Sequence, residues 1–91
     1  MLSIWTETFL AIIENGSLSR ASDQLKITQS TVSLRLKNLE AELGCTLINR
    51  RRGERSLELT SAGKAYLRFA EQMRDISQDM NSDENAGGSL K

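Results

Sequence analysis

The short connection between two predicted helices most restricts how this chain can fold. Apolar residues at helical spacing, with Ser17 as an N-cap, predict a helix over residues 18–25, and a longer helix is expected over 29–43. Only the three residues "KIT" separate them. Two helices joined by so short a connector cross at a steep angle instead of lying antiparallel, which is typical of a helix-turn-helix.

The longer helix is predicted to have one apolar side and one small, polar side. Thr28 is expected to cap its start, and Gly44 to end it. The apolar side, which we expect to face a core, consists of residues three or four positions apart: Val32, Leu36, Leu39 and Leu43. The first turn instead carries short hydrogen-bonding side chains that add little to a core.

The polar side of this helix suits the major groove of a DNA duplex. A helix enters that groove only where its facing side is not bulky, and the base edges there pair with amide and hydroxyl groups. Its N-terminus also presents backbone N–H groups and a positive dipole end to phosphates. We predict DNA contacts by residues at the start of the preceding helix and along this one: Ser17, Arg20, Thr28, Gln29, Ser30, Thr31, Ser33, Leu34, Arg35 and Lys37.

Leu34 is the unusual member of this set, because a large apolar side chain is expected to point away from the core. Such a side chain gains a contact with the methyl group of thymine in the major groove. The alternative is an exposed leucine without any role, which is common in soluble proteins.

Two further elements flank the predicted helix-turn-helix. A first helix is expected from Ser3 to Glu14, with Trp5 and Phe9 in the core, and it should end at Asn15-Gly16. After the longer helix, the β-leaning runs 45–49 and 56–60 flank a basic loop that contains glycine. They predict a two-stranded β-hairpin that projects from the helices as a wing.

Positive charge is concentrated in the middle of the chain. The formal net charge of the whole chain is zero, which alone argues against a nucleic-acid partner. Residues 17–55, however, contain eight basic and four acidic side chains. The alternative to a functional role for the wing loop is an ordinary solvated loop. We predict contacts with a phosphate backbone or a minor groove for four of its residues: Arg50, Arg51, Arg52 and Arg55.

A last helix is expected over 61–80, capped by Thr60, and it should extend beyond so small a domain. From Ala62 onward its apolar residues alternate spacings of four and three, as in a coiled-coil seam. A partner is needed to cover the distal part of this seam; the alternative is a frayed, partly solvated helix. We predict a homodimer formed through Tyr66, Phe69, Met73, Ile76 and Met80. The polar residues 81–91 are predicted to be disordered.

The composition disfavours catalysis. The sequence contains no histidine and a single cysteine, Cys45, which we expect to act as a small buried hydrophobe. It also has neither a P-loop nor a dinucleotide-binding glycine pattern, so we expect no enzyme activity, no cofactor and no bound metal. Without a leader-like N-terminus or a long apolar run, a cytoplasmic protein with no membrane partner is expected.

Several ordered motifs resemble the N-terminal winged helix-turn-helix of LysR-type transcriptional regulators. The motifs span roughly residues 3 to 70 and comprise Phe9, "NGSLSRAS", "TQSTVS", "LKNLEAELG", "TLINR" and "LELTSAGKAYL". Ser30 stands where the family usually has proline, and Leu34 where it often has arginine. The resemblance implies a bacterial DNA-binding regulator that dimerises through the helix after the wing. It also implies an effector domain after that helix, so we expect no small-molecule effector site within these residues.

These observations together predict a mainly α, winged helix-turn-helix protein with a three-helix core, a two-stranded β-hairpin wing and a long C-terminal dimerisation helix. Residues 1–60 would form the DNA-binding domain, 61–80 the linker or dimerisation helix, and 81–91 a disordered tail. The leading function is sequence-specific binding of double-stranded DNA as a transcriptional regulator. The alternative is a protein-interaction module that pairs with, or modulates, a longer regulator.

Overall fold

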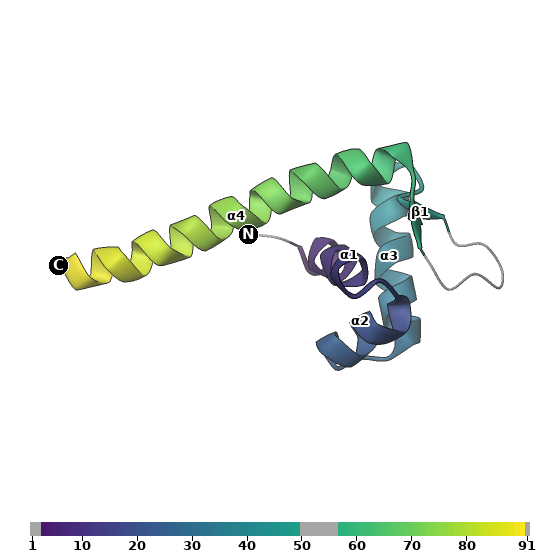
Figure 1. Ribbon diagram of the computed structural model, residues 1–91, viewed down its shortest axis with the longest axis horizontal. Coiled ribbons are helices and arrows are strands. Elements are labelled where there is room, and N and C mark those ends of the chain that lie inside the picture. The colour runs from purple at the N-terminus through teal and green to yellow at the C-terminus, as the bar shows by residue number, and fades with distance from the viewer. Residues whose placement is uncertain (1–2, 50–56, 91) are drawn as a thin grey trace.

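The computed structural model describes residues 3–49 and 57–90, with side chains up to residue 76. The elements are α1 (Ile4–Asn15), α2 (Leu18–Leu25), α3 (Gln29–Leu43), β1 (Ile48–Asn49), β2 (Glu58–Leu59) and α4 (Ser61–Leu90). Figure 1 shows α1, α2 and α3 gathered at one end of the molecule, while α4 extends away from them. This is the predicted mainly α architecture with a two-stranded wing.

Each of the first three helices begins at a side-chain cap. Ser3, Ser17 and Thr28 each accept the backbone N–H of the residue three positions on, at 3.1 Å. Helices α1 and α3 end at Gly16 and Gly44, whose φ angles of 77° and 73° lie in the left-handed region that glycine adopts without strain. The predicted caps at Ser17 and Thr28 and the predicted stops at both glycines are therefore confirmed.

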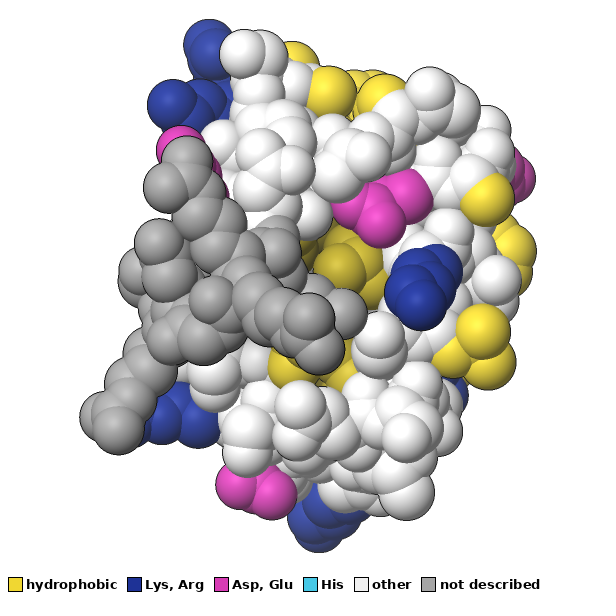
Figure 2. Space-filling view, turned by 90° about the vertical axis from the view of Figure 1, so that its right-hand side faces the viewer, with side chains coloured by type: hydrophobic (Ala, Val, Ile, Leu, Met, Phe, Trp, Pro, Cys, Tyr) yellow, Lys and Arg dark blue, Asp and Glu magenta, His cyan; other side chains and the backbone are white. Residues whose placement is uncertain are grey.

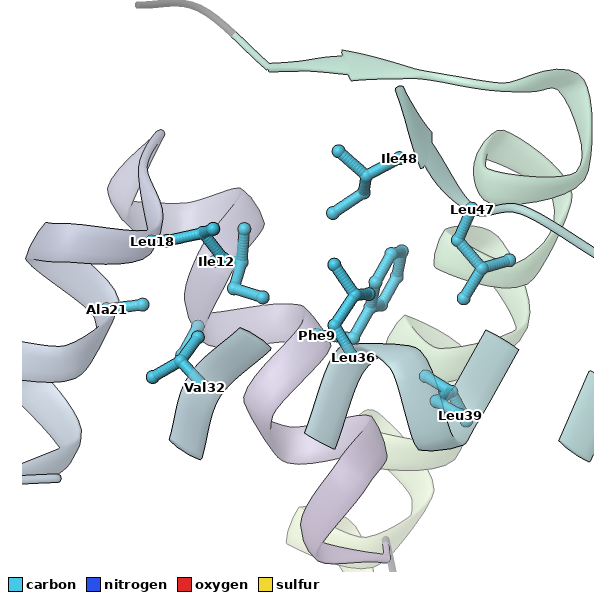
Figure 3. Packing of buried hydrophobic residues seen from close by; sticks show 10 residues of the cluster. Phe9, Ile12, Leu18, Ala21, Val32, Leu36, Leu39, Leu47 and Ile48 are labelled. Atoms are coloured by element: carbon cyan, nitrogen blue, oxygen red, sulfur yellow. The ribbon is translucent and has the colours of Figure 1, made fainter. Parts of the chain in front are cut away.

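The core lies where the three helices meet β1 (Figure 3). Phe9, Ile12, Val32 and Leu47 are fully buried, with the apolar residues of α2 beside them. The prediction for the apolar side of α3 holds except at Leu43, which is 42% exposed. Leu43 is the last residue of its helix, so its side chain extends beyond the neighbouring helices that cover the earlier turns.

The wing strands are shorter than predicted. Antiparallel pairing joins Ile48 to Leu59 and Asn49 to Glu58, so two residues of each predicted five-residue run form the ladder. Just before β1, the Leu47 N–H bonds to the Glu40 carboxylate on α3, and the Thr46 and Leu47 carbonyls bond to Thr60, the cap of α4. These bonds lie at the base of the wing.

Helix α4 begins as predicted, because the Thr60 hydroxyl accepts the Gly63 N–H at 2.9 Å. It continues to Leu90, however, so residues 81–90 are helical and not the disordered tail that we expected. The sequence contains no proline to stop the helix, and each added residue of a formed helix gains a hydrogen bond. In the part of the chain that the structure describes, no helix is both long and apolar enough to cross a membrane.

Candidate nucleic-acid interface

The side of α3 opposite the core is open to solvent along its first three turns. Gln29, Ser30 and Lys37 are exposed, and Leu34 is 57% exposed. Ser33 is half-buried at the edge of this side. The predicted orientation of α3 is confirmed by this exposure. The exposed side is thus a mainly polar strip with one leucine in its middle.

At the start of α3, two of the predicted contact residues bond to each other. The hydroxyls of Thr28 and Thr31 lie 2.8 Å apart, and the Thr28 hydroxyl also accepts the Thr31 N–H at 3.1 Å. The Thr28 side chain is thus engaged in capping the helix. The helix dipole leaves the turn that carries Gln29 and Ser30 with a partial positive charge, which favours a phosphate nearby.

Helix α2 and the turn that follows it carry a second set of polar and basic residues. Arg20 is exposed on the first turn of α2, beside the half-buried cap Ser17. Lys26 is exposed in the turn itself, with a φ of 59°. Lys26 was not among the contacts predicted from the sequence, although a basic residue within a predicted helix-turn-helix turn is a signal that could have identified it.

Arg35 occupies a different side of α3 from Leu34 and Lys37. It is half-buried, and its Nη1 lies 3.5 Å from the Thr8 hydroxyl on α1, a long and weak hydrogen bond. Thr8 in turn donates to the Ile4 carbonyl at 2.7 Å. The structure therefore does not group Arg35 with the exposed strip, and its predicted DNA contact stays a prediction.

The predicted wing contacts Arg50, Arg51, Arg52 and Arg55 lie outside the described residues. Figure 2 looks at the molecule from the wing side, with the undescribed residues in grey. Beside them, basic, acidic and apolar side chains are interspersed over a surface of mainly uncharged atoms. On this face the described residues offer a mixed surface and not a continuous basic one.

The five residues predicted to form a dimer differ in exposure. Tyr66 is half-buried and also packs within its own subunit, because its hydroxyl lies 2.7 Å from that of Thr6 and its ring packs edge-on against Phe9, with centroids 5.5 Å apart; its contact with a partner stays a prediction. Phe69 and Ile76 are instead 54% and 59% exposed. The remaining two are Met73, which is half-buried, and Met80, whose side chain is not described.

Helix α4 is held against α1 by further contacts. Ala70 is fully buried, one turn beyond Tyr66. Arg74, another turn on, bonds to the carboxylate of Glu14 at the end of α1, and this hydrogen bond raises the pKa of Arg74 above its ordinary value. Both side chains of the pair are partly exposed, so we expect a small contribution to stability.

Comparison with known proteins identifies the family to which this fold belongs. Residues 5–64 match the family described as "Bacterial regulatory helix-turn-helix protein, lysR family". The chain belongs to the LysR family. Its fold, four helices with a two-stranded antiparallel wing, is that of the winged-helix DNA-binding domains in this family.

Relatives and solved structures agree with this assignment. The HTH-type transcriptional regulator CrgA of Neisseria meningitidis (serogroup C, strain 8013) is 43% identical over 65 residues, 71% of this chain and 21% of CrgA. HdfR of Shigella boydii (serotype 18) is 39% identical over 72 residues, 79% of this chain and 25% of HdfR. This LysR-family chain thus spans about a fifth to a quarter of the length of these two regulators.

Two solved structures that resemble this LysR-family chain contain DNA. The structure titled "CbnR_DBD-DNA complex" has a TM-score of 0.83 and 28% identity, and it covers 97% of this chain and 99% of that one. "BenM_DBD/catB site 1 DNA Complex" has a TM-score of 0.81 and 32% identity, covering 90% and 86%.

Proposed function

We propose that this LysR-family domain binds double-stranded DNA sequence-specifically within a transcriptional regulator, with the exposed side of α3 in the major groove. The observation that carries the proposal is the strip of Gln29, Ser30 and Leu34, which is open to solvent while Val32 and Leu36 on the other side are buried. This strip has no charged or aromatic side chain, so it lets a helix approach the base edges closely. The two similar structures solved with DNA support DNA binding by a domain of this fold.

Four side chains in the first half of α3 have chemistry that fits the groove. The Gln29 amide both donates and accepts, which matches the N6 and N7 atoms of adenine. Ser30 and Ser33 offer hydroxyls to either kind of base, and Leu34 offers an apolar contact to a thymine methyl group. Base reading is therefore assigned to these four residues.

Phosphate contacts hold the domain in position on the duplex. Arg20 on α2 and Lys37 on α3 are both exposed. Lys26 joins them from the turn. The four wing arginines named above are proposed to reach the phosphate backbone or an adjacent minor groove. These contacts are independent of sequence, so they give affinity that weakens as salt increases.

The domain is proposed to act as a homodimer through α4. Phe69 and Ile76 are exposed on a helix that extends away from its own core, and a second copy of the helix would cover them. Twofold symmetry would then present two α3 helices to half-sites one DNA turn, or a multiple of it, apart. The same exposed residues favour a second candidate, in which this chain pairs with a longer relative and blocks its function.

Selection from random duplexes tests the proposal. The protein is expected to enrich a pseudo-palindromic duplex and to bind it more tightly than a scrambled duplex of equal length. If about six basic side chains of a dimer contact phosphates, log affinity should fall with log salt at a slope of about five. No enrichment, or equal affinity for both duplexes, would refute sequence-specific binding and favour the interaction module.

A further inference from the structure

The backbone around Leu47, at the base of the wing, is held by hydrogen bonds on two sides. The Leu47 N–H donates to the carboxylate of Glu40 on α3 at 2.7 Å, and the Ile48 N–H reaches the same oxygen at 3.3 Å. The Leu47 carbonyl accepts the Thr60 N–H at 3.0 Å and lies 3.2 Å from the Thr60 hydroxyl. Leu47 thus bonds on one side to α3 and on the other to the residue that caps α4.

Two further contacts tighten this junction. The Thr60 hydroxyl also donates to the Thr46 carbonyl at 2.5 Å. Gly63, in the first turn of α4, lies so close to Leu47 that a Cβ there would come within 2.0 Å of the Leu47 carbonyl oxygen. The side chain of Leu47 is itself fully buried in the core. The start of α4 therefore rests directly on the backbone that Glu40 holds.

We propose that Glu40 is a positioning residue that fixes the direction of α4 relative to α3 and thereby sets the half-site spacing that the dimer accepts. This inference rests on the proposed function, because it concerns the relation between the DNA-reading helix and the dimerisation helix. A carboxylate suits the task, since hydrogen bonds to a charged acceptor are shorter and stronger than those to a neutral one.

The length of α4 amplifies any change in its direction at the junction that Glu40 holds. The longest extent of the molecule is 55 Å, and α4 runs away from the junction (Figure 1). A small rotation at Leu47 therefore causes a displacement that grows along α4 and moves Phe69 and Ile76, where a partner would attach. In a dimer each subunit contributes this displacement, so the separation between the two α3 helices changes.

Binding to duplexes of different spacing measures this role. The probe is a duplex that the wild-type protein has selected, compared with the same duplex lengthened by one base pair between the half-sites. For the wild type we expect the insertion to weaken binding about tenfold, and we call this loss of affinity the spacing penalty. For Glu40→Ala we expect a penalty of about threefold or less, with affinity for a single half-site within about twofold of wild type.

Matched variants separate positioning from general damage. Glu42→Ala removes the same charge from an exposed site on α3 and should keep the wild-type spacing penalty. Glu40→Gln retains an acceptor oxygen for the Leu47 N–H and should largely restore the penalty. If Glu40→Ala does not fold, Thr60→Val, which removes the hydroxyl on the other side of the junction, should reduce the penalty, whereas Thr60→Ser should not. An unchanged penalty in the junction variants, or an equal loss in Glu42→Ala, would overturn the proposal.

A measurement without DNA keeps this proposal distinct from the proposed function. Spin labels at Ala41→Cys on α3 and Glu71→Cys on α4, both exposed positions, report the distance between the two helices in a Cys45→Ser background. With labelled protein diluted in unlabelled protein, the distance distribution should be broader for Glu40→Ala than for Glu42→Ala. Equal widths would refute the role of Glu40, whereas a wild-type protein that selects no duplex would refute only the proposed function.

Discussion

The Tyr66 hydroxyl lies 2.7 Å from the Thr6 hydroxyl, which in turn lies 2.9 Å from the hydroxyl of Ser3. Ser3 caps α1, so a chain of three hydroxyls connects the first turn of α1 to α4 across 60 residues of sequence. Tyr66 also packs on Phe9, which is fully buried. Helix α4, the proposed dimerisation helix, is thus joined to the core of its own subunit.

Removing the hydroxyl tests the strength of this connection. Tyr66→Phe keeps the ring against Phe9 but leaves the Thr6 hydroxyl without this partner, so the free energy of unfolding should fall by about 1 kcal/mol. Urea denaturation measures the change. Thr6→Val should cost more, because it also removes the bond to Ser3. A Tyr66→Phe variant as stable as the wild type would show that the hydroxyl is satisfied equally well by water.

Because Gly63 lies so close to Leu47, adding one methyl group at position 63 should strongly lower the free energy of unfolding. A Cβ at position 63 would lie 2.0 Å from a backbone oxygen, which can move only if the junction itself shifts. We expect Gly63→Ala to lower the free energy of unfolding on the order of 3 kcal/mol, measured by urea denaturation.

Gly16→Ala is the matched control for that variant. At Gly16 a Cβ would meet nothing within 4 Å, and the cost arises only from the φ of +77°. That cost should be about 1 kcal/mol. An equal loss of stability in the two variants would contradict the close contact at Gly63.

Dimerisation through α4 predicts that a charged side chain on the exposed side of this helix weakens self-association. Phe69→Asp places a carboxylate in the proposed interface and should weaken self-association by at least about tenfold, as sedimentation equilibrium would measure. Leu34→Asp makes a similar change at an equally exposed site on α3, 57% against 54%, and should leave association unchanged. Equal effects, or none, would count against this interface.

The parts of the fold that depend on neighbouring residues were predictable from the sequence. The caps at Ser17 and Thr28 and the stops at Gly16 and Gly44 each involve residues within one helical turn, so short motifs specify them. The exposed side of α3 followed from the spacing of Val32 and its apolar neighbours alone. Helical periodicity therefore determined which residues of the candidate site face outward.

The contacts that join distant segments could not be predicted in this way. The bonds from Glu40 to the base of the wing depend on how the chain turns after Gly44, and no pattern of residues encodes that path. Tyr66 lies on the apolar seam of α4, yet only the packing of α1 against that helix shows that its ring contacts Phe9 of the same subunit. Arg35 likewise follows Leu34 directly but lies toward Thr8.

Base reading by the exposed side of α3 is the central claim, and the ratio of affinities for a selected and a scrambled duplex tests it most directly. That ratio should fall about tenfold in Gln29→Ala and in Ser33→Ala, while affinity for the scrambled duplex stays the same. Glu42→Ala, on the same helix, should keep the wild-type ratio. An unchanged ratio in both variants, measured at two salt concentrations, would contradict the claim that this side of α3 reads the bases.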